Sequence, residues 1–230
     1  MNVDYVSHLA AESGGILYLM AILLLVALTV IVERGWYLGR AISRGEVVTR
    51  QVMNLTHFDR ATLQLLARRE AGFPHGQVLA APMSHPDLTD PLRLSEVLEE
   101  AILMQARQVD RRMWMLDTIV TLAPLLGLLG TIIGMFHAFE VLGSPGTPPT
   151  AITGGIAEAL VATACGLFIA IIGLVAFNGL NNSVRVVVHQ LECIKVMLVN
   201  RLDSPAAPRR VVSDTAGALA PASALSGARA

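Results

Sequence analysis

Three polar side chains lie in or beside long uncharged stretches, and their chemistry suggests where function resides. Glu158 directly precedes an uncharged run over 159–184, Thr163 lies inside that run, and Thr131 lies inside another over 118–136. A carboxylate at mid-bilayer costs about 2.5–3.5 kcal/mol, and such a residue usually faces a water-filled cavity or a partner. Hydroxyls in both runs would suit a water-accessible path, so Glu158, Thr131 and Thr163 are the candidate lumen residues.

Each of these residues also has a purely structural interpretation. Glu158 can lie just outside the hydrocarbon as an anion in the first turn of a helix. Either threonine can bond its own backbone carbonyl four residues earlier. Ideal helix geometry sets Thr163 about 140° around the axis from Glu158. The two share a polar surface only if the lumen is wide or the helix start at Gly154 and Gly155 is distorted. The residues alone leave both interpretations open.

The elements that must position these side chains are transmembrane helices. Hydrophobic residues make up 53% of the 230 residues, charged residues make up 15%, and the mean hydropathy is +0.58. Three uncharged runs, over 13–32, 118–136 and 159–184, reach or approach the roughly 20 residues that a helix needs to cross a bilayer. The composition therefore predicts an all-α integral membrane protein with three transmembrane helices.

The arginines next to these runs predict the orientation in the membrane. Arg34 follows the first run, Arg112 precedes the second and Arg185 follows the third. Because positive residues favour the cytoplasmic side, the N-terminus is predicted outside and the C-terminus inside. The predicted organisation is an N-terminus outside the cytoplasm over 1–12, transmembrane helices over 13–33, 117–138 and 156–182, a cytoplasmic loop and helical region over 34–116, an outer loop over 139–155, a cytoplasmic helix over 183–203 and a disordered cytoplasmic tail over 204–230.

The second and third helices are expected to extend into the cytoplasm as long helices. Asp90 is a candidate N-cap with Pro91 in the first helical position. From there to about Leu142 the only helix breaker is Pro124, which predicts one long helix with a kink at that proline. The third helix is expected to continue to about Asp203. The segment over 143–149 is rich in glycine and proline and is expected to be a turn that makes the two helices an antiparallel hairpin.

Small residues recur along both runs with three- and four-residue spacing. Such spacing gathers small side chains on one helix face and lets membrane helices approach closely. Packing within one subunit and packing between subunits fit this pattern equally well. The glycines of this stripe are Gly127, Gly130, Gly134, Gly166 and Gly173.

Nothing in the sequence predicts catalysis. His57, His75 and His85 lack the spacing of metal ligands, and no phosphate-binding glycine loop or nucleophile–base pair is present. The two cysteines do not suggest a disulfide framework. We expect no metal, no cofactor, no nucleic-acid partner and no enzymatic activity.

Two ordered blocks of sequence resemble a known family. Residues 123–136 resemble the second-span signature of the MotA/TolQ/ExbB proton-channel family, and residues 155–167 resemble the third-span signature of its ExbB/TolQ branch. Asn178 matches the asparagine that closes the second motif. The family commonly has Ala-Ile-Pro after this signature, whereas Ala170 and Ile171 are followed here by Ile172. That departure puts a kink at this place in doubt but leaves the polar positions matched.

The resemblance implies a proton-motive-force energiser of the bacterial inner membrane. In that family, five such subunits surround the helices of a small one-span partner similar to ExbD or TolR, which carries a protonatable aspartate. By motif position, the ring contributes Thr131, Thr163 and Glu158. A third protein, similar to TonB or TolA, transmits the work across the periplasm in transport or envelope maintenance.

Other interpretations stay open at this point. A non-conducting membrane scaffold or assembly subunit would use the small residues for packing alone. A half-sized secondary transporter fits less well, because three spans lack the discontinuous helices of a substrate site. The sequence does not distinguish an ExbB role from a TolQ role, nor H⁺ from Na⁺.

Overall fold

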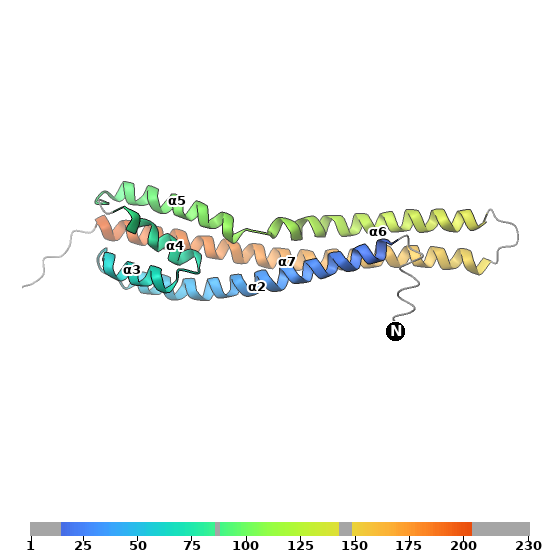
Figure 1. The fold of residues 1–230 in the computed structure, drawn as a ribbon, viewed down its shortest axis with the longest axis horizontal. Coiled ribbons are helices and arrows are strands. Elements are labelled where there is room, and N and C mark those ends of the chain that lie inside the picture. Colours follow the sequence, from blue (N-terminus) through green and yellow to red (C-terminus); the bar gives the residue numbers. More distant parts are fainter. Residues whose placement is uncertain (1–14, 86–87, 143–148, 204–230) are drawn as a thin grey trace, which may run out of the picture.

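Long helices dominate the computed structural model, which describes residues 15–85, 88–142 and 149–203. Helix α2 (Ile16–Met53), helix α6 (Met113–Leu142) and helix α7 (Pro149–Asp203) lie side by side over much of their length (Figure 1). The shorter elements α3 (Arg60–Arg69), α4 (Pro74–Ala80), the 3₁₀ turn η1 (Ala81–Ser84) and α5 (Pro91–Val109) gather at one end. The described residues contain no strand, so the predicted all-α class is confirmed.

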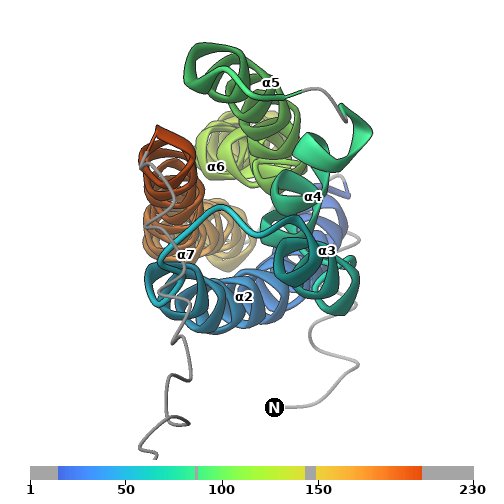
Figure 2. The same ribbon diagram turned by 90° about the vertical axis from the view of Figure 1, so that its left-hand side faces the viewer.

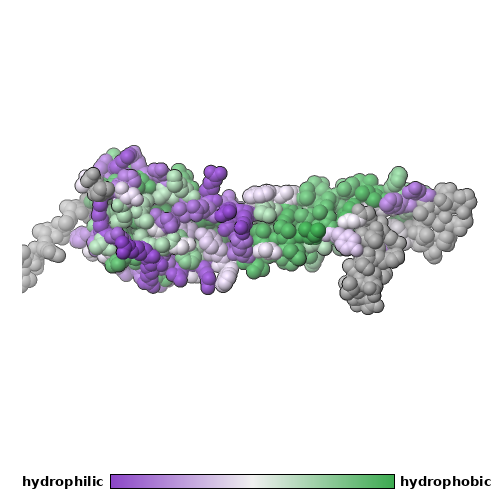
Figure 3. All heavy atoms as spheres, in the orientation of Figure 1, coloured by the Kyte–Doolittle hydropathy of each residue, from purple (hydrophilic) through white to green (hydrophobic). Residues whose placement is uncertain are grey.

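Three helices are long and apolar enough to cross a membrane, as expected. Figure 3 shows an apolar surface over these helices, bordered by a hydrophilic band toward the end that carries α3, α4 and α5. The predicted termini over 1–12 and 204–230 lie outside the described residues, as does most of the predicted turn over 143–149.

Helix α2 extends far beyond its predicted span. The sequence predicts a transmembrane helix over 13–33 and assigns long extensions only to the other two, yet α2 continues to Met53. The larger buried apolar residues in the added part form a stripe that recurs every three to seven positions: Leu38, Ala41, Val48 and Val52. Such a stripe stabilises a helix through packing rather than through propensity.

The predicted long helix over 91–142 is interrupted, which corrects that expectation. Asp90 caps α5 as predicted, accepting a hydrogen bond from Leu92 N at 3.1 Å with Pro91 next to it. However, α5 ends at Val109 and α6 begins at Met113, and Arg112 between them has a φ of +69°. Helix α6 runs through Pro124.

The predicted loop over 139–155 is also largely helical. Helix α6 continues to Leu142 and α7 already begins at Pro149. Gly154 and Gly155 lie within α7, although glycine disfavours helices by about 1 kcal/mol relative to alanine. A Cβ added at Gly155 would lie 3.4 Å from Ala138 Cβ on α6, an ordinary contact distance, and one at Gly154 would meet no described atom within 4 Å, so close packing does not require glycine at either position.

Two apolar cores hold the helices together. One joins α2, α6 and α7 and includes Met20, Leu116 and Ile169. The other joins the short helices to the ends of α2 and α7 and includes the fully buried Leu63 and Leu191. The end view in Figure 2 shows α2, α6 and α7 arranged around one another, with α3, α4 and α5 beside them.

A buried polar network links α4, α7 and α2. His75 is fully buried, and its Nε2 lies 3.0 Å from Gln190 Oε1. Gln190 Nε2 donates to Ile42 O at 3.2 Å, which leaves Oε1 as the acceptor for a neutral His75 protonated at Nε2. His75 Nδ1 is buried and has no hydrogen-bond partner in the described part of the chain. Burial therefore lowers the pKa of His75 below its ordinary value.

This network predicts acid sensitivity. Because the pKa of His75 is lower in the folded state, the unfolded chain binds more protons once the pH falls below about 6.5. Stability should be complete above that pH and decrease below it. In thermal unfolding from pH 7.5 to 5.5, His75→Leu should show a weaker pH dependence than the wild type, whereas the exposed-site control His85→Gln should not. Equal pH dependence in wild type and His75→Leu would contradict this assignment.

Candidate functional site at the α6–α7 hairpin

The glycine stripe lies where α6 and α7 of the same chain meet. A Cβ added at Gly130 would lie 2.8 Å from Ala162 Cβ, and one at Gly134 would lie 2.7 Å from Ala159 Cβ. Such separations are shorter than real Cβ contacts, so only glycine fits without movement. A Cβ at each of the other three glycines would also lie close to the partner helix: 3.0 Å from Thr163 at Gly127, 2.5 Å from Ala123 at Gly166 and 2.8 Å from Val120 at Gly173.

Thr163 makes a hydrogen bond across this contact. Its Oγ1 donates to Gly127 O on α6 at 2.9 Å, rather than to the carbonyl four residues earlier on its own helix. The close backbone approach at Gly127 makes this possible, because an added Cβ there would lie 3.0 Å from Thr163 Cα. The structural interpretation, in which Thr163 bonds the carbonyl four residues earlier on its own helix, is therefore wrong.

Thr131, by contrast, does bond a backbone carbonyl of its own helix. Its Oγ1 donates to Leu128 O at 2.7 Å, three residues earlier on α6. The side chain is partly exposed, as is that of Thr163. A hydroxyl that donates to a backbone carbonyl still has lone pairs with which to accept a hydrogen bond.

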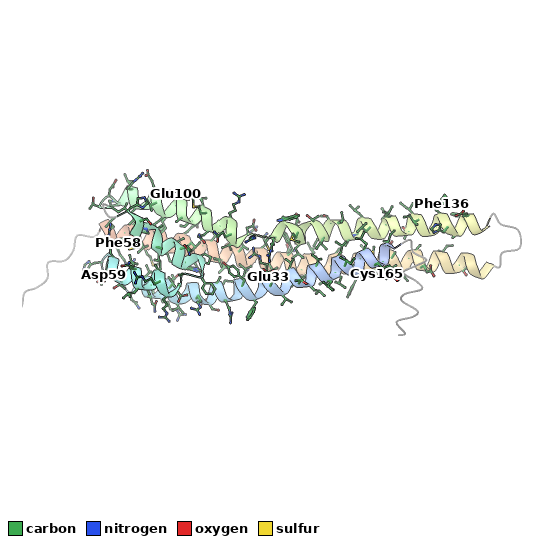
Figure 4. All side chains as sticks on the ribbon, in the orientation of Figure 1. Glu33, Phe58, Asp59, Glu100, Phe136 and Cys165 are labelled. Atoms are coloured by element: carbon green, nitrogen blue, oxygen red, sulfur yellow. The ribbon has the colours of Figure 1, made fainter. Side chains whose placement is uncertain are left out.

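Both hydroxyls lie on the side of the hairpin away from α2. Gly130 faces α2, because a Cβ added there would lie 3.6 Å from Ile16 Cγ2. Thr131 is about 100° further around α6, on the side away from α2. On α7, Cys165 borders a groove with α2, and Thr163 is about 160° around from it. Figure 4 shows Cys165 at the level where α2 begins. We call this side of α6 and α7, marked by Thr131 and Thr163, the uncovered face.

Glu158 is not brought onto the uncovered face. Residues 149–203 form one helix through Gly154 and Gly155, so the separation of about 140° between Glu158 and Thr163 is retained. Glu158 lies one turn outward of Ala162, on the flank of α7 nearer α2, and is partly exposed. Helical distortion therefore does not unite the three candidates, and a wide lumen is the remaining way for them to share one aqueous space.

Further polar residues lie on the uncovered face, and of these the sequence motifs point only to Asn178. Asp117 and Thr121 lie on the same side of α6 as Thr131, and both are exposed. Thr121 Oγ1 donates to Thr118 O at 2.9 Å. Asn178 is exposed on the same side of α7 as Thr163. The helical phase of these residues is the signal that could have grouped them.

No metal site accompanies these groups in the described residues. Across 15–85, 88–142 and 149–203, no three His, Cys, Asp or Glu side chains lie close enough to hold a metal ion. Hydrogen-bond exchange through hydroxyls and carboxylates is the chemistry that the hairpin offers.

Comparison with known proteins gives a consistent result. A family model described as the MotA/TolQ/ExbB proton channel family matches residues 70–193, which include Thr131, Glu158 and Thr163. The protein "Putative biopolymer transport protein ExbB-like 1" of Synechocystis is 32% identical over 174 residues, covering 73% of this chain and 67% of that protein. "Biopolymer transport protein ExbB" of Neisseria gonorrhoeae is 38% identical over 127 residues, covering 51% of this chain. The match spans 58% of the neisserial protein's length.

Proposed function

The chain belongs to the MotA/TolQ/ExbB proton channel family, and from this we propose that it is the channel subunit of an inner-membrane energiser driven by the proton motive force. The observation that carries the proposal is the pair of hydroxyls, Thr131 and Thr163, on the uncovered face. They lie within about one helical turn of each other along the hairpin. Asp117, Thr121 and Asn178 share this face, so the hydroxyls suit a path for protons better than a lipid-facing surface.

In the proposed assembly, the uncovered faces of several copies point toward a central space. A ring of about five subunits would surround a one-span partner similar to ExbD or TolR. Its protonatable aspartate would exchange hydrogen bonds with Thr131 and Thr163, each of which retains acceptor capacity. Glu158, outward of this level, would draw protons toward the entrance. A TonB- or TolA-like protein would then transmit the work, without any enzymatic step on this chain.

A partner is required by the chemistry of the hairpin itself. Between Asp117 and Glu140, the described part of α6 carries no carboxylate. The two hydroxyls alone do not form a relay through the depth of the membrane. An acidic group supplied at the level of Thr131 would bridge this gap.

A non-conducting scaffold is the second candidate. Its support is that both hydroxyls already donate to carbonyls of the hairpin, Thr131 to Leu128 and Thr163 to Gly127. Helix packing alone would account for those two bonds. The two candidates differ in whether the uncovered face binds a partner and passes protons.

Reconstitution separates the two functions. The chain should be purified from membranes with and without a one-span partner bearing an intramembrane aspartate, and its copies counted by native mass spectrometry. Vesicles with both proteins should relax an imposed pH gradient faster than vesicles with this chain alone. The same experiment with an imposed sodium gradient tests whether Na⁺ is conducted instead of H⁺. Vesicles that remain tight to both ions would favour the scaffold.

The orientation proposed for the inner membrane gives a separate prediction. Reporter fusions at residue 146 should be periplasmic, and fusions at residues 75 and 215 should be cytoplasmic, because the arginines flank the opposite ends of the spans. A periplasmic phosphatase and a cytoplasmic fluorescent protein provide complementary readouts. A cytoplasmic signal at residue 146 would reverse the assignment.

A further inference from the structure

A basic cavity lies outside the hairpin site, where α2 passes the junction of α5 and α6. Its volume is about 460 Å³. Four arginines line it: Arg34 and Arg40 from α2, and Arg111 and Arg112 from the junction. Glu33 is the one carboxylate among its lining residues, and Figure 4 shows Glu33 level with the interruption between the two helices.

Arg34 is the strongest sign that this cavity binds an anion. Only 6% of the residue is exposed, and its Nε is buried without a hydrogen-bond partner among the described residues. Its Nη2 reaches Gln108 O at a long 3.4 Å, and its guanidinium lies 5.6 Å from the centre of the Tyr37 ring. No carboxylate within the described residues forms an ion pair with Arg34. The charge of the neighbouring Glu33 offsets only part of the cost of burying this cation, so an anionic acceptor would stabilise it.

The other charges around the cavity strengthen the case for a bound anion. Glu33 forms an ion pair with Arg112, which leaves three arginines of the cavity without a carboxylate among the lining residues. The backbone of Arg112 has a φ of +69°, a conformation that non-glycine residues rarely adopt. Arg111 and Arg112 line the cavity from this turn, and Arg112 pairs with Glu33 of α2. Strain kept at such a place commonly marks a functional site.

The position of the cavity identifies the class of anion. The hydrophilic band of Figure 3 borders the apolar surface, and Arg34, the lining residue of α2 next to Glu33, lies just beyond the apolar span of that helix. Trp36 is 68% exposed and carries Arg40 stacked 4.4 Å above its ring centre. Exposed tryptophans are typical of membrane interfaces, and basic pockets at the cytoplasmic surface bind phosphate-bearing head groups. The planar guanidinium groups match phosphate geometry.

We propose that this cavity binds the phosphate group of an anionic phospholipid through Arg34, Arg111 and Arg112. The assignment to the cytoplasmic leaflet rests on the proposed orientation, whereas phosphate binding itself does not depend on proton conduction. The bound head group would connect α2 to the α5–α6 junction and thereby fix the helices where they leave the membrane. Free phosphate offers the same chemistry, and the experiment separates the two sources.

Tryptophan quenching in vesicles provides a direct test on the full chain. The chain contains two tryptophans, so Trp114→Phe leaves Trp36 as a reporter beside the cavity. Brominated phosphatidylglycerol should quench Trp36 several-fold more effectively than brominated phosphatidylcholine. Arg111→Gln, at an exposed residue whose removal should not prevent folding, should lower this preference by about fivefold. Arg68→Gln, an exposed arginine of α3 that does not line the cavity, should leave it unchanged.

Whether the bound phosphate belongs to a lipid or is free is tested in the same vesicles, with inorganic phosphate replacing chloride at equal ionic strength. The preference for phosphatidylglycerol should persist. Its disappearance would assign the cavity to free phosphate and overturn the lipid proposal. Equal quenching by the two lipids, or an equal loss in Arg111→Gln and Arg68→Gln, would overturn it as well. Neither quenching result depends on proton flux, so failure of the lipid proposal is distinguishable from failure of the proposed function.

Discussion

Replacing Gly166 with alanine should loosen the α6–α7 hairpin and lower its free energy of unfolding by about 1–3 kcal/mol. The added Cβ would lie 2.5 Å from Ala123 O and 3.2 Å from Gly127 Cα. These are backbone atoms, so no side-chain rotation relieves the clash and the helices must separate. Separation would also weaken the hydrogen bond from Thr163 to Gly127 O. Thermal unfolding in detergent should show a lower melting temperature, and less of the variant should be recovered as a homogeneous species.

Gly179 provides the matched control on the same helix. A Cβ at Gly179 meets nothing within 4 Å among the described residues, and alanine favours helix over glycine by about 1 kcal/mol. Gly179→Ala should therefore melt at the wild-type temperature or above it. If both variants melt alike, the close approach at Gly166 does not contribute to stability.

The transmembrane helices could be predicted because their signals are local. An uncharged run of sufficient length and the Asp90–Pro91 cap each depend on neighbouring residues. The small residues of the stripe could likewise be recognised by their spacing. Their contact partners could not, because spacing is the same whether Gly134 faces Ala159 of its own chain or a residue of another subunit.

The interruption at Arg112 could not be predicted for the opposite reason. Nothing between Val109 and Met113 breaks a helix by its own propensity. The turn is held by contacts distant in sequence: Arg112 pairs with Glu33, and the buried Met113 and Val109 belong to the core shared with α2. Local propensity is weak compared with such tertiary contacts. The extension of α2 to Met53 has a similar cause, because its apolar stripe becomes visible only when the neighbouring helices are known.

The candidate site also combines features that the sequence predicts with features that depend on tertiary contacts. Thr131 and Thr163 could be identified from their positions in the apolar runs, and the angle between Thr163 and Glu158 followed from helix geometry. The choice of Gly127 O by Thr163 could not, because it depends on the backbone of α6 approaching closely at a glycine. The grouping of Asp117 with Thr131 required knowing which side α2 covers.

The double variant Thr131→Val, Thr163→Val should lose most of the proton-driven activity while still assembling. Valine keeps the shape of threonine and removes the hydroxyl, so a partner aspartate would lose both hydrogen-bond partners on the uncovered face. A loss of tenfold or more corresponds to about 1.4 kcal/mol or more in the barrier for transfer. The stability cost should be small, about 0.6–2 kcal/mol for the bond from Thr163 to Gly127 O. Proton flux per assembled complex, measured in vesicles containing the one-span partner, separates these effects.

Serine variants and Glu158 complete this test. Thr131→Ser with Thr163→Ser retains both hydroxyls and should keep most of the activity, which a role in packing methyl groups would not predict. Glu158→Ala should reduce proton flux, and Glu158→Gln should retain part of it if hydrogen bonding rather than charge matters. Wild-type flux in the double valine variant would reduce both threonines to packing residues and leave Glu158 as the remaining candidate of the three. Because Glu158 and Thr163 are about 140° apart on α7, a loss in both variants would require an aqueous space wide enough to reach both flanks of that helix.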